Sequence, residues 1–137
     1  MARIGPVKLA IKIKGDTATA DVTYDILFSK TDIKKQTAYE EEVRLIGDDT
    51  HAGDPPEAGG DETLEFMSPL FNKDVKAGTK ETLTRKHKKS FRALDLNEDM
   101  NAIPNPDEIR ALVTIRPANA PQRMSRRESP MVKLRLG

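Results

Sequence analysis

Apolar and polar residues alternate with a period of two near both ends of the chain, and this pattern constrains the fold more than any other feature. Near the amino terminus the apolar positions are Val7, Leu9, Ile11 and Ile13, and near the carboxyl terminus they are Ile109, Ala111, Val113 and Ile115. Successive side chains of a strand point to opposite faces, so such a run buries one face and exposes the other. The pattern therefore predicts an antiparallel β domain.

Similar signals divide the rest of the chain into elements. Strands are expected at about 6–14, 18–28, 39–45, 64–66, 81–96, 108–116 and 132–136. The pair Gly15-Asp16 has the composition of a turn and joins the first two strands into a hairpin. The segments 29–35 and 71–79 read as connections. For 81–96 strand is favoured over helix, because Thr82, Thr84 and Phe91 prefer strands.

The third expected strand contains an acid on its apolar side. Glu41 shares the parity of Tyr39, Val43 and Leu45, whereas Glu40, Glu42 and Arg44 share the other. We expect this strand to begin exposed and to become buried toward Leu45. Glu41 is a candidate buried acid if that register holds.

The length and composition favour a single domain with a thin core. The chain has 137 residues, of which 36% are hydrophobic and 33% are charged, and we expect one domain over 1–137 with its core between two sheets. The order of about seven strands resembles immunoglobulin-like or fibronectin type III-like sandwiches, above all in the paired last strands joined by a loop. The cysteine pair and core tryptophan of true immunoglobulin domains are missing. The resemblance implies an architecture and no activity.

Several classes of chemistry are excluded or disfavoured by the residue types. The chain has no cysteine, which excludes disulfide scaffolds, thiolate metal sites and cysteine nucleophiles. It has two histidines, His51 and His87, and no nucleotide-binding or zinc motif. We therefore expect no enzymatic activity. The first residues lack the apolar run of a signal peptide, so a cytoplasmic location is expected if Met1 is the native start.

Charge is distributed unevenly, although the formal net charge is only +1. Acids gather between Tyr39 and Phe66, and bases gather between Lys73 and Arg92 and again between Arg110 and Arg135. Complementary regions of this kind favour association between surfaces of opposite sign. They predict a non-catalytic structural or protein-protein interaction module that self-associates.

The stretch 47–61 combines glycine, proline and acids without apolar periodicity, and it reads as a long flexible loop. Its aspartates could offer oxygen ligands to Ca²⁺: Asp48, Asp49, Asp54 and Asp61. The alternative function is thus a Ca²⁺-dependent ligand-binding or carbohydrate-binding module. Their spacing does not match an EF-hand, and a solvated loop explains the same composition. His51 has no second histidine nearby, so no transition-metal site is expected.

Two basic segments are candidate partner-binding sites. The first contains Arg85, Lys86, Lys88 and Lys89, and the second contains Arg123, Arg126 and Arg127. A strand over 81–96 carries charge on both sides near its middle, which suits an edge strand, with His87 on its basic surface. An acidic protein or a second copy is the expected partner. Nucleic acid is not expected, because Phe91 is the lone aromatic residue beside the basic run. Protection of a sheet edge, or a solvated face, is the favoured explanation of the lysines, and a partner-binding role is the alternative.

Overall fold

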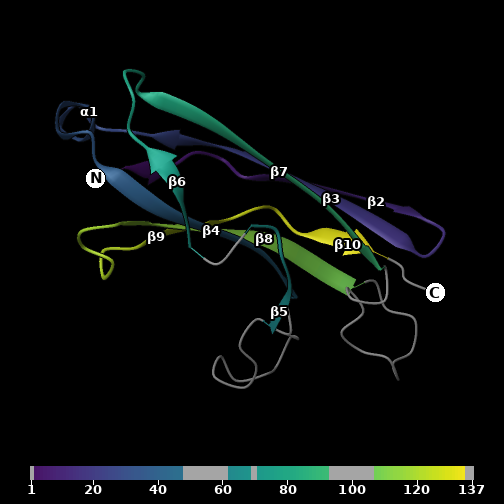
Figure 1. Cartoon of the computed structure of the whole chain (residues 1–137). Helices are drawn as coiled ribbons and strands as arrows, with labels where there is room; N and C mark the ends of the chain where they lie inside the picture. Colours follow the sequence, from purple (N-terminus) through teal and green to yellow (C-terminus); the bar gives the residue numbers. More distant parts are fainter. Residues whose placement is uncertain (1, 48–61, 69–70, 93–106, 135–137) are drawn as a thin grey trace.

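The computed structural model describes residues 2–47, 62–68, 71–92 and 107–134, and these form two packed antiparallel β-sheets. Figure 1 shows the two layers, with β2, β3 and β7 in one and β4, β5 and β8 in the other. The chain is therefore an all-β sandwich, as the alternation predicts. Among the described residues no helix is long and apolar enough to cross a membrane.

Sheet A is built around one long central strand. β3 (Thr17–Leu27) pairs on one side with β1 (Arg3–Ile4) and β2 (Lys8–Lys14), and on the other side with β7 (Thr82–Arg92). The predicted hairpin is present, with Lys14 opposite Thr17. Gly15 in its turn has a φ of 61°, a left-handed conformation that glycine adopts without steric cost.

Sheet B is built around two central strands. β4 (Ala38–Gly47) pairs with β8 (Asp107–Pro117) along its length. β5 (Glu62–Phe66) and β6 (Asn72–Lys76) follow one another along the other edge of β4. β9 (Ser125–Glu128) and β10 (Val132–Leu134) do the same along β8. Three places in the sheets are each occupied by two strands that follow one another: β1 with β2, β5 with β6, and β9 with β10. The ten described strands therefore fill seven places, close to the number of strands expected.

Three expected connections contain regular structure, and one of them, the loop 117–130 between the last two expected strands, contains β9. Residues 29–35 include the short helix α1 (Lys30–Lys35), which begins with a capping box formed by Ser29 and Asp32. The segment 71–79 contains β6, which alternation does not predict because Val75 is its one apolar residue. The strand expected over 81–96 is confirmed for β7, while 93–106 lies outside the described residues.

The core fills the space between the sheets with the apolar sides of the central strands. All four alternating residues of β8, Ile109, Ala111, Val113 and Ile115, are completely buried. They lie beside Val43 and Leu45 of the neighbouring β4 and pack in the same core as Val22 and Ile26 of β3, all of which are buried as well. Each buried Val, Leu or Ile stabilises the fold by about 1.5–3 kcal/mol relative to an exposed one. The two alternating segments at the chain ends, β2 and β8, lie in different sheets.

Candidate functional site

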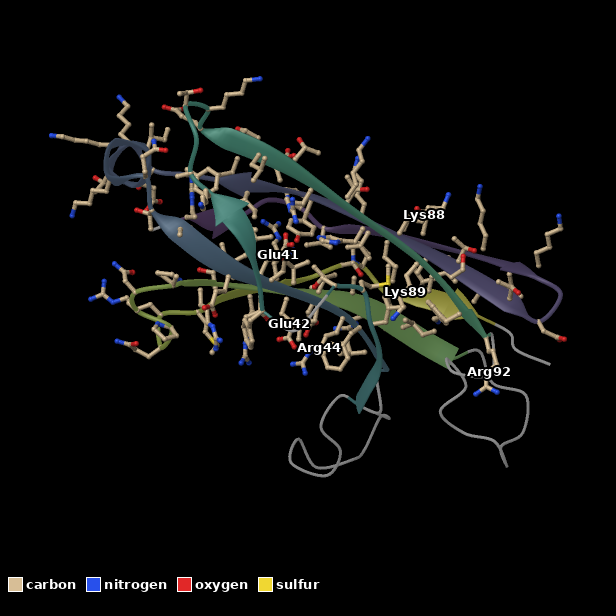
Figure 2. The ribbon with its side chains drawn as sticks, viewed as in Figure 1. Glu41, Glu42, Arg44, Lys88, Lys89 and Arg92 are labelled. Atoms are coloured by element: carbon tan, nitrogen blue, oxygen red, sulfur yellow. The ribbon has the colours of Figure 1, made fainter. Side chains whose placement is uncertain are left out.

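The most polar site inside the sandwich is a cluster around Glu41. Glu41 on β4 points toward sheet A, where it meets side chains of β3 and β7 (Figure 2). Arg85 donates two hydrogen bonds to its carboxylate, from Nε to Oε2 at 3.0 Å and from Nη2 to Oε1 at 2.9 Å. Tyr24 donates its hydroxyl to Oε2. His87 Nε2 lies 3.1 Å from Oε1 and 3.3 Å from the Tyr24 hydroxyl.

The cluster holds a charged carboxylate out of contact with water. The Glu41 residue is 0% exposed. Burial alone would raise the pKa of Glu41, but hydrogen bonds from His87, Arg85 and Tyr24 outweigh it and lower this pKa to about 2. Burial and the neighbouring carboxylate raise the pKa of Tyr24, so its hydroxyl keeps its proton and donates. The arrangement links β4 of sheet B to β3 and β7 of sheet A.

Three expectations for these residues are corrected. The third strand does not begin exposed, because Tyr39 and Glu41 are as buried as Leu45. Glu41 is tolerated there because it meets a guanidinium, a hydroxyl and an imidazole. His87 does not belong to the basic surface: its side chain is 10% exposed and faces Glu41. Arg85 likewise faces inward at 23% side-chain exposure.

The outward side of sheet B carries a network of arginines and acids. In cross-strand register, Glu40 lies opposite Arg116 and Arg44 lies opposite Leu112. Arg116 Nε donates to Glu40 Oε2 at 2.7 Å, and its guanidinium lies 3.4 Å from the centre of the Phe71 ring. Figure 2 shows Glu42 and Arg44 on this side of β4, away from sheet A. A guanidinium over an aromatic ring is attracted by the ring, and arginine and aromatic residues are both enriched at protein interfaces.

An open depression lies on this side, which we call the arginine face. Its lining residues are Arg44, Ile46, Leu112, Arg126, Arg127 and Glu128. Two of the large hydrophobic residues exposed in the described chain adjoin it. Phe66, 41% exposed, is the register partner of Arg44, and Met124, also 41% exposed, contacts the Arg126 guanidinium through its sulfur at 3.8 Å. The depression thus combines an apolar floor, cations and exposed apolar neighbours.

The outward side of sheet A has a different character, and we call it the lysine face. Its cations come from three strands: Arg3 of β1, Lys8, Lys12 and Lys14 of β2, and Lys86, Lys88 and Arg92 of β7. All of these residues are exposed. The central strand contributes threonines together with Asp21 and Asp25. The lysine face forms because β2 and β7 flank β3 with their basic positions on the same side.

The residues expected to bind a partner lie in several places. Lys86 and Lys88 belong to the lysine face, whereas Lys89 has the opposite parity and donates from Nζ to the Phe66 carbonyl at 3.0 Å. Arg126 lines the depression of the arginine face, and Arg123 is exposed in the loop before β9. Arg127 also reaches sheet A, where Nη1 donates to the Ile4 carbonyl at 3.0 Å. With Arg85 bound to Glu41, the set does not form one continuous surface.

The candidate calcium ligands lie outside the described residues. These are Asp48, Asp49, Asp54 and Asp61. Within 2–47, 62–68, 71–92 and 107–134, no group of three or more His, Cys, Asp or Glu side chains is arranged to hold a metal ion. Calcium binding by this segment stays a prediction.

Comparisons with known proteins give no relative for this chain. No family model matches it, and neither the search of curated proteins nor the search of solved structures finds a significant match.

Proposed function

We propose that this domain is a non-catalytic protein-interaction module that self-associates, with the arginine face of one copy binding the acidic segment 48–61 of another. The observation that carries the proposal is the open depression lined by Arg44, Ile46, Leu112 and Arg126, beside exposed Phe66 and Met124. Arginine, methionine and aromatic residues are enriched at the centres of protein interfaces, while lysine is depleted there. This composition favours the arginine face over the lysine face as a protein contact.

Charge supplies the argument for a second copy as the partner. Residues 48–61 contain Asp48, Asp49, Asp54, Glu57 and Asp61 and no lysine or arginine. The arginine face and the adjoining loop contribute Arg44, Arg123 and Arg126. Since one chain carries both signs in separate segments, two copies offer each other complementary surfaces. The arginine face of one copy would bind a different surface, the acidic segment, of the next copy. Such head-to-tail contacts form a ring when the rotation between copies closes and an open filament when it does not.

The strand order supports an immunoglobulin-like, fibronectin type III-like form of the sandwich. One sheet has the order β2, β3, β7, and the other has β10, β8, β4, β5. If these strands are lettered along the chain as in such domains, the first sheet reads A-B-E and the second G-F-C-C′. This architecture hosts many unrelated activities, so the functional proposal rests on the surface.

Sedimentation velocity of the purified chain tests self-association. The wild type is expected to form oligomers at low ionic strength that dissociate as salt is added, because screening weakens contacts between exposed charges. The double variant Arg123→Glu with Arg126→Glu is expected to remain monomeric. A matched reversal on α1, Lys30→Glu with Lys34→Glu, changes net charge equally and should leave association intact. A wild-type monomer at every protein and salt concentration would overturn the proposal.

A further inference from the structure

The cations of the lysine face are arranged in a regular pattern, which is separate from the arginine face and from self-association. They form two rows, one on β2 with Lys8, Lys12 and Lys14, and one on β7 with Lys86, Lys88 and Arg92. β3 separates the rows, so they lie two strand spacings apart, about 10 Å. Along each row neighbouring cations are two or four residues apart, about 7 or 13 Å.

The strip between the two rows is polar and partly acidic. The outward residues of β3 include Thr19 and Thr23 together with Asp21 and Asp25. Thr19 and Ser90 are joined by a hydrogen bond of 2.9 Å between their hydroxyls, and Thr84 donates to Asp25 at 2.7 Å. Positive charge therefore follows two lines flanking a strip that carries both acids of the central strand.

The residue types point to contact with phosphates rather than with bases or apolar side chains. The outward positions of β2, β3 and β7 contain no aromatic residue. A face without aromatic platforms cannot stack the bases of a single strand. Lysine is a flexible point charge that suits sequence-independent contact with phosphate. Its low frequency at protein interfaces separates this face from the arginine face.

We propose that the lysine face binds double-stranded nucleic acid through the phosphates that flank a groove, without reading the base sequence. The two rows, about 10 Å apart, are close to the spacing of phosphates across a groove about 12 Å wide. In this placement the strip with Asp21 and Asp25 lies over the groove and not against phosphate. An anionic bilayer spreads its charge evenly and would press negative charge onto that strip. The scarcity of aromatic residues argues against single strands, whose bases would need stacking partners, and does not bear on contact with a duplex backbone.

Fluorescence anisotropy with a labelled duplex of mixed sequence tests the proposal over a series of salt concentrations. The wild type is expected to bind, with affinity falling steeply as salt rises because bound phosphates release counterions. The triple variant Lys8→Gln, Lys12→Gln and Lys88→Gln is expected to lose at least tenfold in affinity at low salt. The slope of log affinity against log salt should become shallower by about 0.9 for each lysine that contacts a phosphate, about 3 in total.

The matched control removes the same charge away from the lysine face. Lys30→Gln, Lys34→Gln and Lys35→Gln on α1 should leave affinity and slope close to wild type. Equal losses in the two triple variants would mean that net charge alone drives binding, and this would overturn the assignment. Absence of binding at low salt would also overturn it. Two further results would do the same: tighter binding to a single strand of equal length, or equally lysine-dependent binding to phosphatidylserine vesicles.

The melting temperatures of the two triple variants show whether a loss of affinity comes from misfolding or from the loss of contacts with the duplex. The substituted lysines of the lysine face are exposed, so both triple variants should melt close to wild type. Self-association is tested with Arg123 and Arg126 variants, so failure of either proposal leaves the other standing.

Discussion

Arg85 of β7 and Glu41 of β4 form an ion pair across the interior of the sandwich, held by two hydrogen bonds of 2.9 and 3.0 Å. The two strands belong to different sheets and share no backbone ladder. β7 pairs only with β3 among the described strands, so side chains make its polar links to sheet B: Arg85 and His87 reach Glu41, and Lys89 reaches the Phe66 carbonyl. Because the carboxylate is fully buried, removing one member leaves the other charge uncompensated.

Neutralising Glu41 is expected to destabilise the fold strongly. Glu41→Gln keeps the size of the side chain but leaves the Arg85 guanidinium without its counter-charge, and breaking a buried pair in this way costs about 3–5 kcal/mol. Urea unfolding monitored by circular dichroism measures the loss. Glu128→Gln is the matched control: in its ion pair with Arg110 the two side chains are 39% and 31% exposed, so the cost should be about 1 kcal/mol or less. Similar losses for both variants would contradict the importance of the buried pair.

The pH dependence of stability should reveal the ionised state of Glu41. Its pKa is lowered to about 2 in the folded chain from an ordinary value of 4.5. The group therefore contributes stability above pH 4.5 that is lost as the pH falls toward 2, by about 3 kcal/mol in total. The gap in unfolding free energy between wild type and Glu41→Gln should accordingly narrow over this range. A gap that stays constant from pH 6 to pH 2 would show that Glu41 is not stabilised as an anion.

Removing the Tyr24 hydroxyl should have a smaller effect in the same direction. Tyr24→Phe deletes one donor to Glu41 and leaves Arg85 and His87 in place. A hydrogen bond to a charged group contributes about 1.5–3 kcal/mol. Combined with Glu41→Gln, the second substitution should cost less than it does alone, because the two side chains interact. Strictly additive losses in urea unfolding would show that the two are not coupled.

The calcium alternative is tested by thermal unfolding with and without Ca²⁺. Binding by Asp48, Asp49, Asp54 and Asp61 would raise the melting temperature by mass action, and chelator would reverse the rise. Asp48→Asn with Asp54→Asn should abolish such a shift. An unchanged melting temperature across a Ca²⁺ titration would exclude this alternative.

The sequence predicts where the strands lie in the chain better than it predicts which strands and side chains come into contact. Alternation alone identifies β2, β3 and β8, because their apolar positions keep a strict period of two. β3 and β8 bury that side, whereas on β2 Leu9 and Ile11 are only half-buried and Ile13 is 40% exposed. Alternation does not predict the Glu41 cluster. Glu41 and Arg85 are 44 residues apart in the chain, and their contact depends on how the two sheets pack. The one signal in the sequence was that Glu41, an acid, shares the parity of the apolar residues Val43 and Leu45.

The two surfaces illustrate the same difficulty. The lysine face joins β2 to β7 across β3, an order that local pattern does not encode. On β7 the parity of Arg85 and His87 differs from that of Lys86 and Lys88, so one basic run contributes to the interior and to the surface. Leu83 and Phe91 share the parity of Arg85 and His87 and pack against the core, so these two apolar residues at the ends of the run were the signal for its inward side.

Mixing two charge-reversed variants in sedimentation velocity tests the central claim of self-association most directly. One variant carries Arg123→Glu and Arg126→Glu, and the other carries Asp48→Lys, Asp49→Lys and Asp54→Lys. Each is expected to be monomeric alone, because each places like charges in the proposed contact. The equimolar mixture should associate, since both contacts between unlike variants are complementary: the reversed acidic segment meets the reversed arginine face, and the unchanged acidic segment meets the unchanged arginine face. A mixture that sediments as monomers at low salt, where the wild type associates, would contradict the account.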